Sequence, residues 1–303
     1  MPIDISHIPK RLIDASANGD LVPFVGAGIS RHSLTRTSEN LFPTWVELVK
    51  ELLETAIRLD YLSSKDEAEI NALLERRAYP EAAQAVKDIM PEHELGALLR
   101  KRLDSKSAEP GQLHHALLKL RSTLILTTNY DLLLEQAYAK EFGVMPEVVT
   151  PKSSYRVAEA LKLQQSRLNS PLIFKIHGTI DKPLDLVFGL ADYQRLTYGY
   201  PQYRNILSII FMTKIVLILG FSFSDPDLIE VIGGLRGGMH SSVPDYIVLP
   251  QGEKSGIEKK QLRQIFGLEV IEYERSKGHL ELLELIEYLA EFAPPISSEG
   301  REL

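Results

Sequence analysis

LVPFVGAGIS, residues 21–30, joins an apolar run to two glycines that flank an alanine, and it ends in a serine. The run predicts a buried β-strand over Leu21–Val25, because a strand that is covered on both faces is continuously apolar. Glycines directly after a strand permit a turn too tight for side chains and let main-chain N–H groups approach a phosphate. The stretch therefore indicates the first strand and turn of an α/β protein and points to a nucleotide as one possible ligand.

The glycine turn matches neither of two common phosphate-binding motifs in full. The dinucleotide fingerprint has a third glycine three residues after the second, and this chain has Arg31 there. No GxxxxGK[ST] segment occurs, which disfavours phosphoryl transfer through a P-loop. By itself the turn is explained equally well by a nucleotide site and by a tight connection after a buried strand.

Further apolar, β-branched runs alternate with segments of helical periodicity along the chain. This alternation is typical of a parallel sheet covered by helices, because each parallel crossover needs a long connection that is usually a helix. The sequence therefore predicts the α/β class, with a Rossmann-like parallel sheet and helices on both faces. The further predicted strands are Thr123–Thr127, Leu172–Ile176, Ile215–Leu219, Tyr246–Leu249 and Leu268–Tyr273.

We expect residues 1–303 to form a single domain with one helical insert. Residues from about 60 to 120 are charged and rich in alanine and leucine, and they lack strand signals. This composition predicts an all-helical insert between the first two strands. A second helical segment is expected at about 190–212.

The composition narrows the functional classes. The formal net charge is −7, so nothing global favours binding to nucleic-acid backbones or to anionic membranes. No apolar run approaches membrane-spanning length, and the N-terminal segment carries charge throughout, so we expect a soluble cytoplasmic protein without membrane contact. Cysteine is absent, which excludes disulfides, thiol nucleophiles, iron–sulfur clusters and cysteine-based zinc sites.

Polar and small residues follow three more of the predicted strands. Asn129 and Asp131 lie in the segment TTNYD, His177 and Gly178 end KIHG, and Gly220 opens GFSFSDPDL. Because the carboxyl ends of parallel strands meet at one edge of a sheet, where open α/β sheets bind ligands, we expect one site at this edge. A simpler role stays open for the first segment, since Asn129 or Asp131 can cap the helix that follows.

In this order, the motifs GAGIS, TTNYD, KIHG and GFSFSDPDL resemble those of the sirtuin family, over a span from about Asp20 to Leu228. More specifically, they are similar to those of bacterial sirtuin-like proteins that cleave NAD, many of them in phage-defence systems. The resemblance implies an NAD site with a catalytic histidine. It implies Gly26, Ala27, Gly28 and Ser30 at the pyrophosphate, Asn129 and Asp131 at the nicotinamide ribose, His177 as the catalytic histidine, and Gly220 and Ser222 beside ADP-ribose, with Thr128 and Gly178 adjoining them.

The chain departs from the protein-deacylating sirtuins in two ways. Those enzymes carry a zinc ribbon with four cysteines, and this chain has no cysteine; after GAGIS it also reads RHSLTRTSENLFPTW, unlike the deacylase pattern. Without an acyl-peptide substrate, the chemistry implied is transfer of the ADP-ribosyl group to water. The protein is then an NAD+ glycohydrolase in which Asn129 holds the sugar and the water, His177 accepts a proton, and no metal is required.

Two other classes remain open. The same fold can serve as a non-catalytic regulatory module that binds NAD or ADP-ribose, although a pure sensor needs neither Asn129 nor His177. A sirtuin-type ADP-ribosyltransferase or deacylase is the second alternative, and the missing zinc ribbon argues against it.

The implied activity also predicts partners, because an unrestrained NAD hydrolase kills its host. The resemblance to defence-associated members implies the NAD-depleting effector of an anti-phage system that acts by abortive infection. We expect a homo-oligomer and a separate sensor, such as a DNA-translocating ATPase or an Argonaute-like protein. The net charge of −7 makes the chain itself a poor direct reader of DNA.

Overall fold

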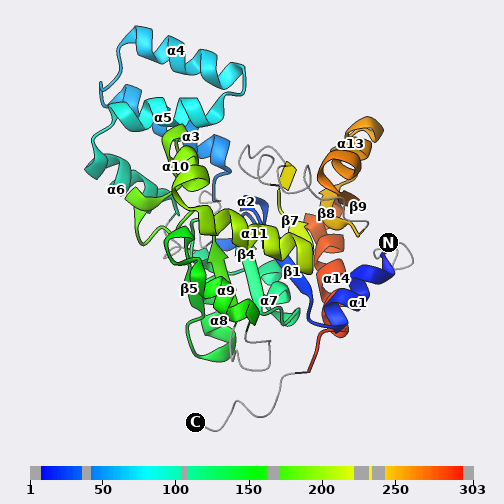
Figure 1. Cartoon of the computed structure of the whole chain (residues 1–303). Coiled ribbons are helices and arrows are strands. Elements are labelled where there is room, and N and C mark those ends of the chain that lie inside the picture. The colour runs from blue at the N-terminus through cyan, green and yellow to red at the C-terminus, as the bar shows by residue number, and fades with distance from the viewer. Residues whose placement is uncertain are drawn as a thin grey trace.

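The computed structural model of the chain places a sheet at its centre, with helices around it and a group of helices beyond one edge (Figure 1). It describes residues 8–35, 42–103, 108–162, 171–221, 232–233 and 243–295. The sheet has seven strands in the order β5-β6-β4-β1-β7-β8-β9, and every neighbouring pair is parallel. The strands are β1 Leu21–Val25, β4 Leu124–Thr127, β5 Glu147–Val149, β6 Leu172–Lys175, β7 Ile215–Leu219, β8 Asp245–Pro250 and β9 Leu268–Tyr273.

These strands confirm the predicted α/β class and all six predicted strands, with ends that differ by at most one residue. The edge strand β5 was not predicted, because three residues carry too little pattern to be recognised. A separate antiparallel pair joins β2 (Leu34–Thr35) to β3 (Ala108–Glu109), and β3 falls in a segment where no strand was expected.

The strand order reverses at β1, and this reversal decides where a ligand can lie. From β1 the chain first builds β4, β5 and β6 on one side, and it then returns to place β7, β8 and β9 on the other. Val25 is level with Thr127 of β4 and with Leu219 of β7, so the carboxyl ends of the three central strands form one edge. In open α/β sheets, the crevice outside such a switch point is the preferred ligand site.

Each face of the sheet is covered by helices. One face packs on α1 (Lys10–Ala17), α7 (Gln112–Lys119), α8 (Leu133–Phe142) and α14 (Ser276–Glu291). The other packs on α9 (Tyr155–Lys162), α10 (Leu190–Gly199), α11 (Pro201–Thr213) and α13 (Gly256–Phe266). Successive residues of β1 alternate between the two cores, which is the period of two that a strand buried on both faces requires.

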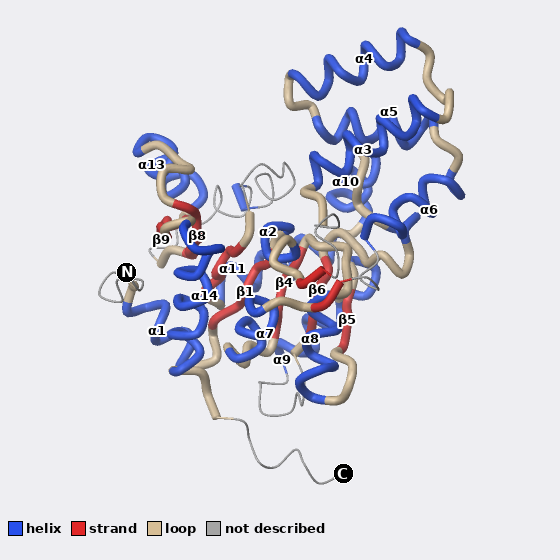
Figure 2. Tube along the Cα trace, turned by 180° about the vertical axis from the view of Figure 1, so that it is seen from behind, coloured by secondary structure: helices blue, strands red, loops and turns tan. Residues whose placement is uncertain are grey.

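A third core lies outside the sheet, in a unit that we call the helical lobe. It consists of α3 (Trp45–Arg58), α4 (Ser64–Glu75), α5 (Tyr79–Ile89) and α6 (Glu92–Leu103). Figures 1 and 2 show these helices standing away from the sheet, with α10 beside α3 and α5. Helix α3 begins at a capping box in which Thr44 accepts from the Glu47 N–H and Glu47 accepts from the Thr44 N–H. Helix α7, although close in sequence to α6, packs against the sheet instead.

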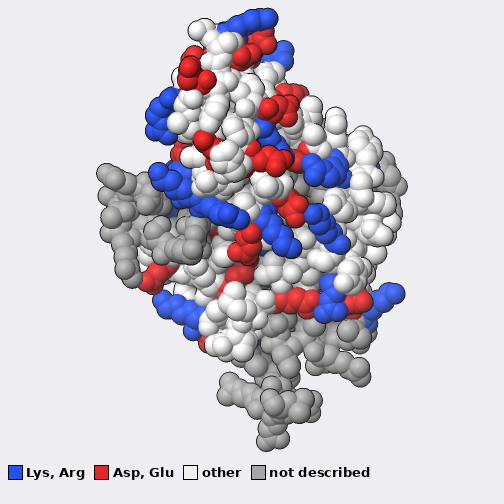
Figure 3. Space-filling view, turned by 90° about the vertical axis from the view of Figure 1, so that its left-hand side faces the viewer, with Lys and Arg blue, Asp and Glu red and all other residues white. Residues whose placement is uncertain are grey.

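The surface shows no dominance of one charge on the face drawn in Figure 3, where acidic and basic side chains are interspersed. Among the described helices, none combines the length and the apolar character that a membrane crossing needs.

Candidate active site

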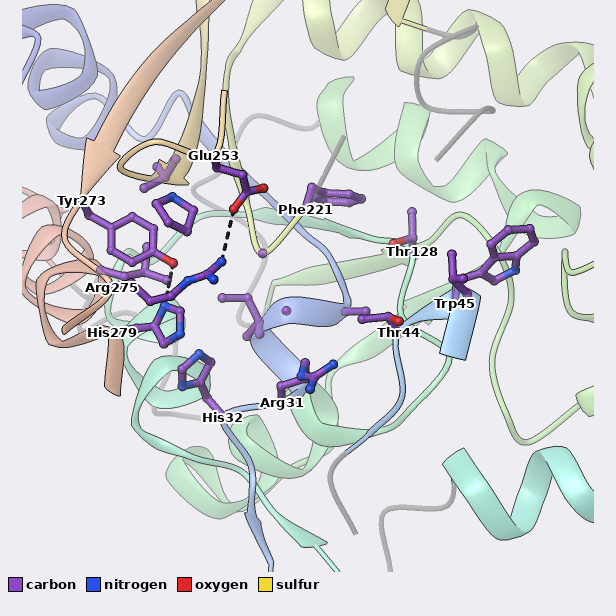
Figure 4. A pocket seen from close by; sticks show the side chains of 18 residues that line it. Arg31, His32, Thr44, Trp45, Thr128, Phe221, Glu253, Tyr273, Arg275 and His279 are labelled. Atoms are coloured by element: carbon purple, nitrogen blue, oxygen red, sulfur yellow. Dashed lines mark hydrogen bonds and ion pairs between the residues drawn. The ribbon is translucent and has the colours of Figure 1, made fainter. Parts of the chain in front are cut away.

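A pocket of about 600 Å³ opens at the carboxyl edge of β1, β4, β7, β8 and β9, where the sequence predicts a ligand site (Figure 4). The turn after β1 forms its floor, the first residues of α3 form one wall, and the ends of β8 and β9 with α14 form the other. Its lining is Ala27, Gly28, Ile29, Arg31, His32, Thr44, Trp45, Val46, Thr128, Gly220, Phe221, Val248, Pro250, Glu253, Tyr273, Arg275, His279 and Leu282.

The glycines of the turn are required by the close approach of β7. The Gly26 N–H donates to Leu219 O at 2.8 Å, and the Gly28 N–H donates to Gly220 O at 2.9 Å. A Cβ atom at Gly28 would lie 2.8 Å from Gly220 O, and one at Gly220 would lie 2.7 Å from Ile29 N. Gly220 also has a φ of +71°, which favours glycine. These contacts bind the turns after β1 and β7 into one rigid floor.

A buried polar network joins this floor to the end of β4. Asn129 donates from Nδ2 to Gly26 O at 3.0 Å and to Ser30 Oγ at 2.8 Å, and Ser30 donates to Asp131 Oδ2 at 2.7 Å. Asp131 Oδ1 accepts the Leu133 N–H at the start of α8, although the N-cap position itself is Leu132 and not one of the two residues that the sequence offered. The Asn129 Oδ1 atom is buried and has no hydrogen-bond partner among the described residues.

The end of β6 is tied to the same loop. The Ile180 N–H donates to Tyr130 O, the Tyr130 hydroxyl donates to Val187 O at 2.6 Å, and the Val187 N–H donates to His177 O. His177 is 2% exposed, and its ring meets the ring of Tyr193 edge to face, with centroids 5.5 Å apart. Both predicted catalytic side chains therefore lie at the expected sheet edge.

An ion pair that sequence reasoning missed supports the loop after β4. Lys175, at the end of β6, donates to Glu135 Oε1 at 2.8 Å, to Tyr130 O at 3.2 Å and to Asp131 O, and both partners of the ion pair are buried. Burial raises the pKa of the Glu135 carboxyl, and Lys175 opposes that shift. A lysine inside the otherwise apolar strand LIFK was the signal that could have identified this pair.

The far end of the pocket carries a group of polar side chains that no motif predicts. Tyr273 and His279 share a hydrogen bond of 2.7 Å through the hydroxyl and Nδ1, and the His32 and His279 rings lie 4.7 Å apart. Arg275 donates to Glu253 at 3.3 Å. Burial lowers the pKa of both histidines; His279 and Arg31 lower that of His32 further, and Arg275 lowers that of His279.

The predicted site residues thus fall into three groups. Ala27, Gly28, Thr128 and Gly220 line the pocket. A second group, Ser30, Asn129 and Asp131, forms the buried network beside it, held to Gly26 O. His177 and Gly178 stand at the end of β6, and Ser222 lies outside the described residues.

The described part of the chain contains no group of three or more His, Cys, Asp or Glu side chains placed to hold a metal ion.

Comparison with known proteins supports the assignment of these motifs. A family model described as a SIR2-like domain matches residues 123–271, a range that includes TTNYD and KIHG and begins after the glycine turn. The NAD(+) hydrolase ThsA of Enterococcus faecium is 25% identical over 288 residues, 93% of this chain. ThsA of Bacillus cereus (strain MSX-D12) is 26% identical over 44% of this chain, and defense-associated sirtuin 2 of Bacillus subtilis is 26% identical over 75%.

These relatives are longer proteins. The matched region covers 54% of the Enterococcus faecium protein, 26% of the Bacillus cereus protein and 20% of the Bacillus subtilis protein. The chain therefore spans about half, or less, of the length of the curated relatives it matches. The fold, the order of the motifs and these matches agree: the chain is similar to sirtuin-like proteins, and its residues 123–271 match the SIR2-like domain.

Proposed function

We propose that the chain is an NAD+ glycohydrolase that cleaves the bond between nicotinamide and ribose and transfers the ADP-ribosyl group to water. The products are nicotinamide, ADP-ribose and a proton. Relatives named NAD(+) hydrolase support this proposal, as does the family of the fold.

The observation that carries the proposal is the orphaned acceptor of Asn129. Its amide nitrogen is fully used by Gly26 O and Ser30 Oγ, while its buried oxygen lacks a donor among the described residues. A buried acceptor without a partner is costly, and in native structures it is often completed by a ligand or a water. The hydroxyl of a bound nicotinamide ribose, or the attacking water, supplies the missing donor.

The chemistry of nicotinamide departure determines which catalytic groups the site needs. Nicotinamide departs as a neutral molecule from a pyridinium cation, so it needs little help from an acid. The sugar passes through an oxocarbenium-like state, and the protein must hold it, exclude other nucleophiles and place one water. In this proposal Asn129 positions the ribose and the water, and His177 accepts the proton that the water loses.

The glycine turn and the network fit the remaining groups of NAD+. Ala27 and Gly28 face the pocket at the switch point and receive the pyrophosphate, with Gly220 and Thr128 beside them. Ser30 and Asp131 hold Asn129 in one orientation, because Asn129 donates to Ser30 and Ser30 donates to Asp131. Gly178, with a φ of +90°, forms the turn after His177, and its N–H donates to Lys175 O at 3.1 Å.

The test is nicotinamide release by variants of the two proposed catalytic residues. Asn129→Ala and His177→Ala are expected to lose at least about 100-fold in rate, as is typical when a positioned catalytic group is removed. Asn71→Ala and His93→Ala are matched controls, because both side chains are exposed on the helical lobe. Circular dichroism and thermal unfolding establish whether each variant is folded. Full activity in both site variants would contradict the assignment, and NAD+ binding without cleavage by the wild type would favour the non-catalytic module.

The mechanism also predicts the response to a reduced substrate and to chelators. NADH is expected to remain uncut, because dihydronicotinamide is not a cationic leaving group. Cleavage of NAD+ is expected to continue in a chelator. Activity that a chelator abolishes and that magnesium or zinc restores would contradict the metal-free mechanism.

For the cellular role, we propose the NAD-depleting effector of an anti-phage system that acts in the bacterial cytoplasm by abortive infection. The relative named defense-associated sirtuin 2 supports this reading. The chain then works as a homo-oligomer, together with a separate sensor of the DNA-translocating ATPase or Argonaute-like type. The mass in solution and NAD+ turnover, measured together over a dilution series with and without candidate partners, test this control. A fully active monomer that no partner affects would overturn it.

A further inference from the structure

Helix α10 joins the helical lobe to the loop that follows β6. It lies beside α5 of the lobe (Figures 1 and 2), and the segment that leads into it is tied to His177, whose carbonyl oxygen accepts the Val187 N–H at 2.9 Å. The first turn of α10 carries Asp192 and Tyr193, and both residues are buried. Neither of them lines the pocket, so any effect that they have on the reaction passes through other residues.

Asp192 fixes the start of α10 to the lobe. Its Oδ2 atom accepts the Gly189 N–H at 2.9 Å and the Phe188 N–H at 3.2 Å. Lys87 of α5 donates to both carboxylate oxygens, at 2.8 and 2.7 Å, and Arg195 donates to Oδ1 at 2.7 Å. The side chain of Asp192 is 4% exposed and that of Lys87 is 24% exposed, so salt screens this ion pair less than an exposed one. The orientation of the first turn of α10 therefore depends on the lobe.

Tyr193 connects this first turn to the proposed catalytic histidine. Its ring meets the His177 ring edge to face, with an interplanar angle of 89° and centroids 5.5 Å apart. It also meets the ring of Trp45, the first residue of α3 in the lobe, with centroids 6.3 Å apart. Because His177 is buried in close-packed surroundings, its imidazole turns only if the ring beside it yields.

We propose that Tyr193 is a positioning residue for His177 and that Lys87 and Asp192 hold it in place, so that the helical lobe sets the orientation of the imidazole. The proposal rests on the proposed function, in which His177 accepts the proton that the attacking water loses. Proton transfer needs its two partners within hydrogen-bond reach, and a displacement of about 1 Å can cost about 100-fold in rate. Substrate binding uses the lining of the pocket, to which neither Tyr193 nor Lys87 belongs. Loss of the contact is therefore expected to lower kcat and to leave KM nearly unchanged.

Steady-state kinetics of nicotinamide release test this expectation. Tyr193→Leu removes the ring, and Lys87→Met removes the charge that α5 supplies. Both variants are expected to lower kcat by about tenfold or more, with KM within about threefold of the wild-type value. Tyr193→Phe keeps the ring and is expected to retain most of kcat. Lys65→Met is the matched control, because Lys65 belongs to the same lobe and forms an exposed ion pair with Glu69.

The Lys87→Met protein is expected to fold, because Asp192 keeps Arg195 and two backbone N–H donors. Circular dichroism and thermal unfolding check this. If the protein does not fold, Tyr193→Leu and Lys87→Arg, which keeps the positive charge, provide the test. In that case Lys87→Arg is expected to have the kcat of the wild type.

A spectroscopic measurement separates this proposal from the proposed activity. The chain has eight histidines, and after labelling with 13C at histidine Cε1 the His177 signal is assigned by its absence in His177→Gln. Lys87→Met leaves both rings in the chain and is expected to move this signal, whereas Lys65→Met is expected to leave it in place. Movement of the signal supports the proposal even if the wild type cleaves no NAD+, in which case only the proposed function fails. An unmoved signal in Lys87→Met, wild-type kcat in Tyr193→Leu, or a Tyr193→Phe protein as slow as Tyr193→Leu would overturn it.

Discussion

Gly28 shows how one residue type serves two purposes. Its missing side chain lets β1 and β7 approach, and its Cα atom also forms part of the pocket floor. The N–H groups of Gly26 and Gly28 are both bonded to backbone oxygens of the β7 end. The packing requirement therefore holds whether or not a ligand is bound, and it is independent of the family's chemistry.

We expect Gly28→Ala to lower the free energy of unfolding by about 1–3 kcal/mol, because the added methyl group meets a backbone oxygen that cannot move freely. Gly256→Ala is the control, since no atom lies within 4 Å of a Cβ built there. Urea unfolding of both variants checks the difference. A Gly28→Ala protein as stable as Gly256→Ala would show that the contact between β1 and β7 is less tight than described.

His114 predicts a specific dependence of stability on pH. It is buried, its Nδ1 accepts the Gly111 N–H, and burial lowers its pKa to about 4 from the ordinary 6.5. At pH values between about 4 and 6.5, His114 binds a proton in the unfolded chain but not in the folded chain. The free energy of unfolding therefore falls as the pH drops from 6.5 toward 4, by about 2–3 kcal/mol at pH values near the lower limit.

Replacing His114 with glutamine removes this proton linkage and keeps a side-chain acceptor. The loss of stability between neutral pH and about pH 4.5 is expected to be smaller in His114→Gln than in the wild type, although carboxylates titrate in both. Urea unfolding at the two pH values gives the comparison. If both proteins lose the same free energy of unfolding between the two pH values, the folded wild type takes up a proton on His114 as readily as the unfolded chain does.

At the scale of elements, the ion pair between β6 and α8 connects the two loops that carry the proposed catalytic residues. Lys175 of β6 holds the carbonyl groups of Tyr130 and Asp131 and the carboxylate of Glu135 on α8. These contacts therefore link the ends of two strands to the start of a helix. A buried pair of this kind is expensive to break, because the partner that remains is left charged and unpaired.

Lys175→Met is expected to lower the free energy of unfolding by about 3–5 kcal/mol, and the double variant Lys175→Met/Glu135→Leu to regain much of it. Lys119→Met, which breaks the exposed pair with Glu287, is expected to cost no more than about 1 kcal/mol. Urea unfolding measures all three. If the double variant is no more stable than Lys175→Met, the cost lies in the lost carbonyl contacts rather than in the stranded carboxylate.

The same scale shows what the sequence could predict. Strands β1 and β7 were located at their exact ends, because continuous apolar runs are set by burial on both faces. The polar residues of TTNYD and KIHG were correctly placed at the edge of the sheet, because they directly follow predicted strands. Glu253 and Arg275 were missed, because their meeting depends on β8 and β9 lying side by side, which no local pattern encodes. The contact of Gly28 with Gly220 was also missed, because it depends on β1 and β7 lying side by side.

For the whole molecule, the core of the helical lobe extends to the segments that follow two strands of the sheet. The cluster inside α3–α6 also contains Tyr130, Leu133, Ile180 and Phe188, which follow β4 and β6. The lobe therefore rests on the same loops that carry the proposed catalytic residues, and a change in its packing reaches them.

We expect the lobe and the sheet to unfold in one transition for this reason. Leu52→Ala, which opens space in the core of the lobe, is expected to cost about 2–5 kcal/mol and to lower the midpoint of the whole transition. Far-ultraviolet circular dichroism follows the helices, and the near-ultraviolet tyrosine signal follows the packing around the sheet. Coincident midpoints in both proteins support one unit. A separate early transition of the helices in Leu52→Ala would show that the lobe unfolds independently.

The position of Trp45 has a practical consequence. It is the only tryptophan in the chain, it lines the pocket, and its ring contacts those of Tyr79, Phe188 and Tyr193. Its indole N–H is buried without an acceptor among the described residues, so its surroundings are largely apolar. Fluorescence excited selectively in tryptophan therefore comes from one side chain, on the wall of the pocket. Filling of the pocket is expected to alter its emission, giving an unlabelled optical titration of any candidate nucleotide.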